Sequence, residues 1–324
     1  MTNEKPLACI CLPLEPELEA RIEASCRLEH ISWAASLDVL VEAVRDADGL
    51  LIGNRLPIGE EVFAAAPKLR VLAGVGVGYD AFDVAAATKR GIAVSNTPDV
   101  LTHAVADLVL GLLFAVSRSL LENAEYVRSG GWSHAARPPR LGFDVRGRTL
   151  GVVGMGRIGR VVTARAQALG MRTLWNDVFS ELPAGAPQSD YRELTELLRE
   201  SDVVSLHTDL NPTSHQLISA DELACMQPHA VLINTSRGPV VDQTALVEAL
   251  EAGRLAACAL DVLEQEPPAA DDPILALPNA LLVPHIGSAT EQTRYAMREL
   301  AVRNLLAVLS GEPPPTCLNP EVLD

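Results

Sequence analysis

Short apolar runs alternate with stretches of helical periodicity along the first 95 residues of the chain. The runs typical of buried strands are Leu7 to Cys11, Leu28 to Ile31, Leu50 to Ile52, Leu69 to Ala73 and Ile92 to Val94. The stretches between them, which mix apolar and polar positions, are Glu15 to Ser25, Leu37 to Arg45, Glu60 to Ala66 and Asp83 to Lys89. Strands that alternate with helices predict a parallel sheet with helices on both of its faces.

A second alternating set follows a long helical stretch. Asn96-Thr97-Pro98 ends the first set, and Leu101 to Glu122 is predicted to form one long helix that passes from one domain to the other. Ser129 to Gly131 and Arg137 to Arg140 indicate exposed loop. The second set of predicted strands begins at Thr149 and continues with Met171 to Trp175, Val203 to His207, Ala230 to Asn234, Leu255 to Asp261 and Ala280 to Val283. This set predicts a second parallel sheet.

The last predicted helix spans about Thr290 to Ser310 and is followed by Gly311 and three prolines. We expect it to return to the first domain. The predicted fold class is therefore α/β, with two doubly wound parallel-sheet domains. One domain is discontinuous and consists of residues 1–100 and 288–324, and the other consists of residues 101–287.

The charge balance limits the classes of partner. The chain has 26 Lys and Arg residues against 42 Asp and Glu residues, a formal net charge of −16. Such a charge disfavours nonspecific binding to nucleic acids and to anionic membrane surfaces. The sequence contains neither a bilayer-length apolar run nor a signal-like start. We therefore expect small-molecule partners, with no nucleic acid and no membrane involved.

The six cysteines lie mostly within apolar runs and not at paired spacings; they are Cys9, Cys11, Cys26, Cys225, Cys258 and Cys317. Cys9 and Cys11 face the same side of a predicted strand and could suggest a metal pair. However, no His or second Cys pair follows at ligand spacing. We expect buried free thiols, no metal site and a reducing, cytoplasmic location.

A glycine-rich turn joins the predicted strand that begins at Thr149 to a predicted helix over Arg160 to Leu169. In its sequence, GMGRIGR, Gly154 permits a tight turn, Gly156 lets the backbone approach a pyrophosphate, and Gly159 lets the helix pack closely on the strand. Arg157 and Ile158 lie where a helix N-terminus would present free N–H groups to phosphates. Such glycines also occur in ordinary turns, but the strand before and the helix after favour a dinucleotide-binding loop.

Asp177 follows the next predicted strand, at a position where a carboxylate can accept hydrogen bonds from the adenosine ribose and repel a 2′-phosphate. No Arg or Lys occurs in the next three residues. The sequence therefore predicts NAD as cofactor in preference to NADP. The alternative is that Asp177 only caps a turn.

Three later strands each lead into a polar residue that could take part in hydride transfer. Arg237, Glu266 and His285 follow the predicted strands that end near Asn234, Asp261 and Val283. Because ligands collect beyond the carboxyl ends of parallel strands, we expect these side chains to share one edge of the sheet. An imidazolium can protonate a carbonyl oxygen, a neighbouring carboxylate can orient it, and a guanidinium can pair with a substrate carboxylate. Taken singly, each residue could instead have a structural or solvent-exposed role.

The motifs together resemble those of the D-isomer-specific 2-hydroxyacid dehydrogenases. The matching segments are GVGVGYD from Gly74, GMGRIGR from Gly154, NTSRGPVVDQTAL from Asn234, ALDVLEQEPP from Ala259 and PHIGSAT from Pro284. They occur in the family's order and cover almost the whole chain. The resemblance implies a Rossmann NAD-binding domain over residues 101–287 and a flavodoxin-like substrate domain formed by the rest.

The resemblance also implies roles for individual residues. Arg237, Glu266 and His285 would be the catalytic residues, with His285 as the acid and base. The backbone amides of Val75 and Gly76 would hold the substrate carboxylate together with Arg237 and His285. The nicotinamide end of the cofactor site would comprise Thr235, Ser236, Arg237, Asp261, His285 and Gly287. A homodimer is implied, in which Trp132 either reaches the neighbouring subunit's active site or packs within its own loop.

Within the family, the chain looks most like the glyoxylate, hydroxypyruvate and 2-ketogluconate reductases. This implies reduction of a small 2-keto acid to the D-2-hydroxy acid by NAD(P)H. Many of those enzymes prefer NADPH, so NADP stays possible despite Asp177. Asp209 stands where the family commonly has proline, which puts the shape of the loop below the adenosine in doubt. The alternatives are another family member such as a phosphoglycerate dehydrogenase, or an NAD-sensing corepressor-like binding protein.

Overall fold

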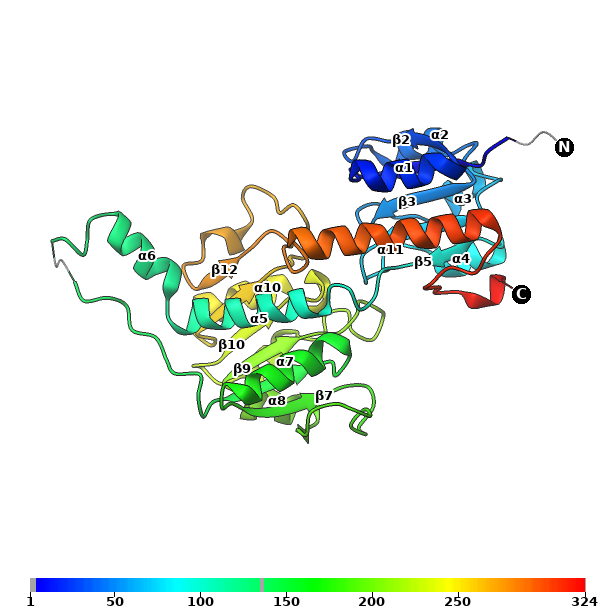
Figure 1. Cartoon of the computed structure of the whole chain (residues 1–324). Helices are drawn as coiled ribbons and strands as arrows, with labels where there is room; N and C mark the ends of the chain where they lie inside the picture. The colour runs from blue at the N-terminus through cyan, green and yellow to red at the C-terminus, as the bar shows by residue number, and fades with distance from the viewer. Residues whose placement is uncertain (1–3, 135–136, 324) are drawn as a thin grey trace. The chain divides into compact units, whose positions relative to one another are not determined.

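The computed structural model describes residues 4–134 and 137–323 and divides the chain into two compact units. Unit 1 comprises Met1–Leu101 and Thr290–Asp324, and unit 2 comprises Thr102–Ala289. The predicted domain boundaries, after residues 100 and 287, lie within two residues of these. Each unit is built on a parallel sheet (Figure 1), which confirms the predicted fold class.

The unit 1 sheet has the strand order β2-β1-β3-β4-β5, which is the flavodoxin-like order. All neighbouring strands are parallel. Its strands are β1 (Leu7–Cys11), β2 (Arg27–His30), β3 (Gly49–Gly53), β4 (Val71–Val75) and β5 (Ala93–Ser95). Its helices are α1 (Pro16–Ser25), α2 (Leu37–Ala43), α3 (Glu60–Ala65), α4 (Val84–Lys89) and α11 (Glu291–Ser310), and the short helix η3 (Pro320–Val322) follows.

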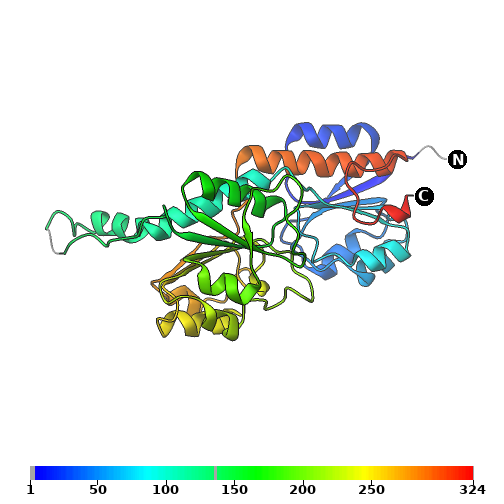
Figure 2. The ribbon, with the colours of Figure 1, turned by 90° about the horizontal axis from the view of Figure 1, so that it is seen from below.

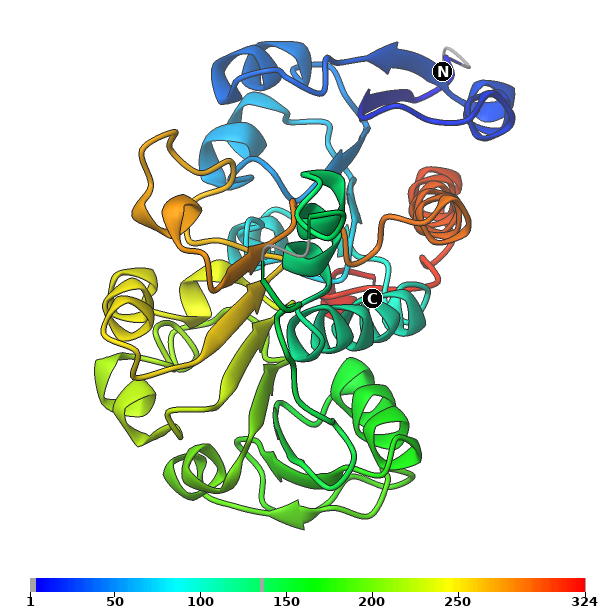
Figure 3. The same ribbon diagram turned by 90° about the vertical axis from the view of Figure 1, so that its left-hand side faces the viewer.

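Both faces of this sheet are covered. Helices α1 and α11 pack on one face, and α2, α3 and α4 on the other (Figure 3). Alternate residues of β1 face opposite cores, with Cys9 in one and Ile10 in the other. A Cβ at Gly49 would lie 2.6 Å from Leu305 Cδ1, so this glycine lets α11 approach the sheet. Burial on both faces explains why β1, β3 and β4 read as continuous apolar runs. The expectation of a buried strand over Leu28 to Ile31 was wrong, because β2 lies at the edge of the sheet and is mostly exposed.

The unit 2 sheet has the order β12-β11-β10-β9-β6-β7-β8, again with parallel neighbours. Its strands are β6 (Thr149–Val153), β7 (Arg172–Asn176), β8 (Asp190–Tyr191), β9 (Val203–Leu206), β10 (Val231–Asn234), β11 (Ala257–Leu260) and β12 (Ala280–Leu282). The direction of strand addition reverses between β6 and β9, which is the switch point where doubly wound sheets bind dinucleotides.

The helices of unit 2 also cover both faces of the sheet (Figure 2). They are α5 (Thr102–Ser117), α6 (Leu120–Arg128), α7 (Arg157–Ala168), α8 (Leu194–Glu200), α9 (Ala220–Cys225) and α10 (Gln243–Glu251), with short helices η1 (Gly238–Val240) and η2 (Pro273–Ala276). Helices α5 and α7 pack together on one face, whereas α8, α9 and α10 enclose the other core.

The prediction of one long helix over Leu101 to Glu122 was wrong. Two helices, α5 and α6, occupy this region with a 61° bend between them, and both belong to unit 2. Ser119 adopts a left-handed conformation with φ of 47°, which interrupts the helical hydrogen bonds. The Ser117 carbonyl instead accepts a hydrogen bond from Phe143 N at 2.7 Å. Apolar periodicity did not reveal this break because it depends on a distant loop.

Among the described residues, no single helix is long and apolar enough to cross a membrane; α5 and α6 pass that test only as a bent pair. The six cysteines are free thiols. Four of them are buried as expected, whereas Cys225 and Cys317 are only partly buried. Burial raises the pKa of both Cys9 and Cys258 to about 12. Within the described ranges, no cluster of three or more His, Cys, Asp or Glu side chains is arranged to hold a metal ion.

Candidate active site

The glycine loop after β6 has the geometry that a dinucleotide cradle needs. Gly154 has φ of +98°, and a Cβ there would lie 2.7 Å from the carbonyl of His207. A Cβ at Gly159 would lie 2.0 Å from the Gly154 oxygen, so the start of α7 packs directly on the turn. A Cβ at Gly156 would meet no described atom within 4 Å. The backbone at Gly156 is therefore open to a bound group.

Helix α7 begins at Arg157, three residues before the predicted start at Arg160. Gly156 occupies the N-cap position, and no described side chain caps the helix. The first N–H groups of a twelve-residue helix thus lie at the glycine loop, where they can bind phosphate oxygens. Arg157 and Ile158, which were predicted to bind the cofactor, lie in the first turn of this helix.

Asp177 follows β7 and lies against the glycine loop. Its Oδ2 accepts a hydrogen bond from Met155 N, and its Oδ1 accepts one from Val178 N, both at 2.7 Å. Asp177 therefore stabilises the turn, as the alternative interpretation held. Each carboxylate oxygen keeps a further lone pair, so acceptance of ribose hydroxyls is still possible.

Two buried threonine hydroxyls lie at the carboxyl ends of β9 and β10. Thr208 Oγ1 and Thr235 Oγ1 have no hydrogen-bond partner among the described residues. Buried hydroxyls are normally paired, so both fit a site that a polar ligand completes. Thr235 was predicted, but Thr208 was not. Thr208 lies next to Asp209, in the loop whose shape differs from the family pattern and which was left out of the predicted site. The neighbouring His207 bonds Ser205 Oγ through Nε2 at 2.9 Å, and burial lowers its pKa to about 3.

The structure brings two of the predicted catalytic side chains into contact. His285 Nδ1 and Glu266 Oε2 are 2.7 Å apart, and Glu266 Oε1 accepts a hydrogen bond from Leu263 N. Burial opposes ionisation of Glu266, but the His285 hydrogen bond and the charges of His285 and Arg237 outweigh it, so the Glu266 pKa lies below its usual value. Glu266 is therefore a carboxylate at neutral pH. The other ring nitrogen, Nε2 of His285, has no partner within the described part of the chain.

Arg237 lies in the turn after β10, which Asn234 shapes. Asn234 Oδ1 accepts hydrogen bonds from Ser236 N and Oγ, and its Nδ2 donates to the Arg237 carbonyl at 2.9 Å. A Cβ at Gly238 would lie 1.8 Å from the Leu263 oxygen, so this turn packs directly on the loop that carries Glu266. The structure thus places the guanidinium, carboxylate and imidazole at one edge of the unit 2 sheet.

Asp261 fixes the loop that carries His285. Its Oδ1 and Oδ2 accept hydrogen bonds from Ile286 N at 2.6 Å and Gly287 N at 2.8 Å, and its carbonyl accepts one from His285 N. His285 itself has φ of 52°, which is uncommon for a residue with a side chain. Burial raises the pKa of Asp261 despite these hydrogen bonds. Because both oxygens of Asp261 face the loop, its evident task is to hold the imidazole in position.

The predicted carboxylate-binding residues Val75 and Gly76 belong to unit 1. Gly76 has φ of +145°, but its N–H donates to Thr97 Oγ1 at 2.9 Å. The expectation that this amide binds substrate therefore needs correction, because the donor is already used within unit 1. The described backbone hydrogen bonds give no acceptor to the N–H groups of Val77 and Gly78.

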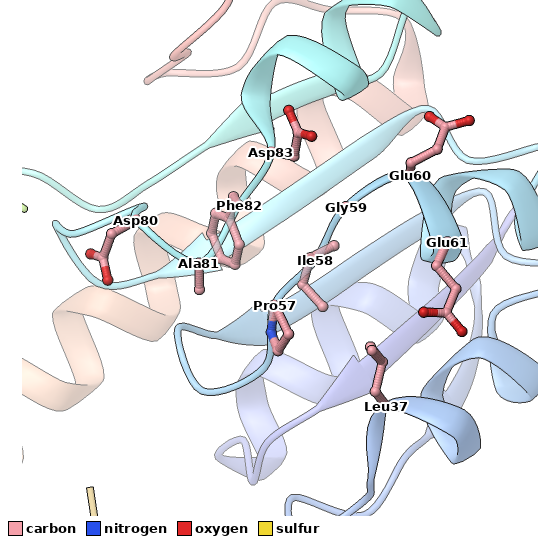
Figure 4. Close-up of a pocket in the computed structure, with 10 residues that line it drawn as sticks. All are labelled: Leu37, Pro57, Ile58, Gly59, Glu60, Glu61, Asp80, Ala81, Phe82 and Asp83. Carbon is pink, nitrogen blue, oxygen red and sulfur yellow. The ribbon is translucent and has the colours of Figure 1, made fainter. Parts of the chain in front are cut away.

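A hollow of about 410 Å³ in unit 1 does not suit an anionic substrate. Figure 4 shows four acidic side chains around it: Glu60, Glu61, Asp80 and Asp83. Arg90 pairs with Glu60, and Asp83 accepts a hydrogen bond from Ala86 N as the cap of α4. The carboxylates would repel a 2-keto acid, so we do not assign the active site to this hollow.

The chain is similar to known proteins in sequence and in fold. The model of the D-isomer specific 2-hydroxyacid dehydrogenase NAD binding domain matches residues 110–287. A glyoxylate reductase of Korarchaeum cryptofilum is 48% identical over 293 residues, which cover 89% of this chain and 87% of the relative. A solved structure of a Thermus thermophilus protein is 44% identical with a TM-score of 0.89, and covers 96% of this chain and 99% of its own.

A second solved structure carries ligands. It is an NADPH-dependent glyoxylate/hydroxypyruvate reductase of Sinorhizobium meliloti in complex with NADP and malonate, 32% identical with a TM-score of 0.85 and 97% coverage of both chains. The family model covers more than half of the chain, and the curated relative covers most of it. The chain therefore belongs to the D-isomer specific 2-hydroxyacid dehydrogenase family.

Proposed function

We propose that the protein reduces a small 2-keto acid to the D-2-hydroxy acid with a reduced nicotinamide cofactor. The observation that carries this proposal is the 2.7 Å contact between His285 and Glu266 at the sheet edge that also bears Arg237 and the glycine loop. Relatives named glyoxylate reductase and glyoxylate/hydroxypyruvate reductase support a short substrate such as glyoxylate or hydroxypyruvate.

Each side chain has a role that its chemistry permits. The reduced nicotinamide, when bound, supplies a hydride. His285 donates a proton from Nε2 to the carbonyl oxygen, and Glu266 stabilises the imidazolium and fixes Nδ1 as its hydrogen-bonded nitrogen. Arg237 pairs with the substrate carboxylate and polarises the adjacent carbonyl. Asp261 keeps the His285 loop in the orientation that this proton transfer needs.

We propose that the N–H groups of Val77 and Gly78 bind the substrate carboxylate, in place of the Gly76 N–H, which already donates to Thr97 Oγ1. The Val75 amide, also expected from the sequence, stays a prediction. Consecutive backbone N–H groups in a glycine-rich turn form an anion-binding concavity. Both residues are partly exposed.

The activity is tested with purified protein and a panel of 2-keto acids, each assayed with NADH and with NADPH. We expect turnover of glyoxylate or hydroxypyruvate and none of long or branched 2-keto acids. Tight NADH binding with no turnover of any member of the panel would contradict the proposal and favour a nucleotide-sensing protein.

For the cofactor we propose NAD over NADP because of Asp177. Replacement of Asp177 by asparagine keeps an acceptor oxygen for the loop but removes the charge that repels a 2′-phosphate. We expect the preference for NADH over NADPH, measured as a ratio of kcat/KM values, to fall about tenfold, since unit charges at close range interact by about 1 kcal/mol or more. Asp190→Asn, which removes an exposed carboxylate from β8, is the matched control and should leave the ratio unchanged. An unchanged ratio in Asp177→Asn would refute the assignment.

We further propose a homodimer in which α6 and the residues after it meet a second copy of the chain. Figure 1 shows α6 extended away from the unit 2 sheet. Large exposed apolar side chains lie on α6 (Leu120, Leu121 and Val127) and among the described residues that follow it (Trp132 and Leu141). Asn123 nevertheless ties α6 to the returning chain through two 2.9 Å hydrogen bonds with Arg140. An ordered apolar surface of this kind is typical of a protein interface.

Leu121→Glu should convert the dimer to a monomer, because association would bury an unpaired carboxylate. Light scattering after size-exclusion chromatography should give twice 34.5 kDa for the wild type and 34.5 kDa for the variant. Val39→Glu replaces a comparably exposed apolar residue on α2 of unit 1 and should stay dimeric. A monomeric wild type would end this proposal.

We also propose a reducing, cytoplasmic location, which the six free thiols support.

A further inference from the structure

A buried polar segment lies beside the glycine-rich turn of unit 1. The segment is Asn96 and Thr97, directly after β5, and the turn is Gly74 to Gly78, at the end of β4. Thr97 is 0% exposed and Asn96 is 7% exposed. Buried polar side chains are retained where they satisfy specific partners.

Three hydrogen bonds hold the three successive peptide units around Gly76 and Val77. Gly76 N donates to Thr97 Oγ1 at 2.9 Å, and Thr97 N donates to the Gly76 carbonyl at 2.7 Å. Asn96 Nδ2 donates to the Val77 carbonyl at 2.8 Å. Both neighbouring carbonyls and the Gly76 N–H are therefore occupied, which orients the next two N–H groups, those of Val77 and Gly78.

The segment is itself anchored from distant parts of unit 1. The Asn96 carbonyl accepts hydrogen bonds from Thr316 Oγ1 at 2.6 Å and from Asn304 Nδ2 at 3.2 Å. Asn304 is fully buried in α11, and its Oδ1 accepts a hydrogen bond from Thr316 N. A fully satisfied buried network of this kind allows one arrangement of its members. The anchored network is thus a rigid support for the turn.

We propose that Thr97, assisted by Asn96, is a positioning residue that directs the Val77 and Gly78 amides toward the substrate carboxylate. This inference rests on the proposed function. Thr97 touches neither substrate nor cofactor; it acts by holding Gly76 in a conformation, φ of +145°, that leaves the following N–H groups unpaired within unit 1. Its effect should therefore fall on recognition of the anion and not on the proton or hydride transfer.

The test compares Thr97→Val with Thr97→Ser. Valine keeps the shape but removes the acceptor for Gly76 N, whereas serine keeps the acceptor. We expect Thr97→Val to raise KM for glyoxylate and the dissociation constant of oxamate in the NADH-loaded enzyme about five- to tenfold, the equivalent of one lost hydrogen bond. Saturated kcat and the NADH dissociation constant should change less than about twofold, and Thr97→Ser should behave like the wild type.

A second readout does not depend on catalysis. Amide hydrogen exchange over residues 74–80 in the ligand-free protein should be faster in Thr97→Val than in Thr97→Ser. If Thr97→Val does not fold, Asn96→Asp removes the donor to the Val77 carbonyl and should give the same rise in KM. Unchanged KM and oxamate affinity in a folded variant would overturn the inference. A wild type that reduces no 2-keto acid would instead overturn the proposed function, whatever the exchange result.

Discussion

Replacement of His285 by glutamine is expected to lower kcat for 2-keto acid reduction by about a thousandfold, the middle of the range for loss of a general acid. Glutamine is similar in length and can still contact Glu266, but it cannot give up a proton at neutral pH. The NADH dissociation constant, measured by fluorescence titration, should stay within about twofold, because the change concerns the proton transfer and not the glycine loop.

The chain provides a matched control for this experiment. His229 Nε2 lies 2.8 Å from Asp202 Oδ1, so it forms a histidine–carboxylate pair of nearly the same length. That pair precedes β9 and β10, at the amino ends of the strands, where no ligand is expected. His229→Gln should leave kcat unchanged. Equal activity of His285→Gln and the wild type would refute the assignment of the acid.

Much of the fold was predictable because its physics is local and periodic. Strands buried on both faces are mostly apolar. β1 and β3 contain no polar side chain, and β6, β9 and β10 contain one each: Thr149, Ser205 and Asn234. The parallel direction then places the residue after each strand at a known edge. For this reason the sequence could predict that Arg237 and His285 lie at the same edge of the sheet, although they are 48 positions apart (285 − 237) in the chain.

What the sequence could not predict depends on contacts between residues that are far apart in the chain. The break at Ser119 is accompanied by a hydrogen bond from Phe143 to Ser117. The Gly76 N–H donates to Thr97 Oγ1, which follows a different strand. Asp261 Oδ1 accepts a hydrogen bond from Ile286 N, 25 positions later in the chain. In the last two cases a sequence motif indicated the right segment. Which N–H or oxygen already has a hydrogen-bond partner could be seen only in the structure.

The loop that carries His285 shows how the fold would support the proposed chemistry. His285 occupies a left-handed backbone conformation that costs about 1 kcal/mol or more for a residue with a Cβ. The buried Asp261 compensates by accepting the two following N–H groups. The imidazole is thus held from both sides, by Asp261 through the backbone and by Glu266 through Nδ1, so its position is set before any substrate arrives.

Two glycine substitutions in the loop after β6 should separate cofactor binding from folding. Gly156→Ala adds a methyl group that meets no described atom within 4 Å, at a φ of −73°, so the melting temperature should fall only by the small amount expected when alanine replaces glycine at an N-cap. If the cofactor binds as proposed, the methyl group would occupy space that its pyrophosphate needs, and we expect the NADH dissociation constant to rise about a hundredfold.

Gly159→Ala should behave differently, because its Cβ would lie 2.0 Å from the Gly154 backbone oxygen. We expect both weaker NADH binding and a loss of about 1 to 3 kcal/mol in the free energy of unfolding, as for other overpacked sites. Gly111→Ala within α5, where a Cβ also meets no described atom within 4 Å, is the control and should retain NADH affinity with equal or higher stability. The contrast between Gly156→Ala and Gly111→Ala is decisive. Both sites have room for a methyl group in the protein alone. A loss of NADH binding only in Gly156→Ala would therefore identify the open space at Gly156 as the cofactor site. Equal NADH affinity in the two variants would exclude this site.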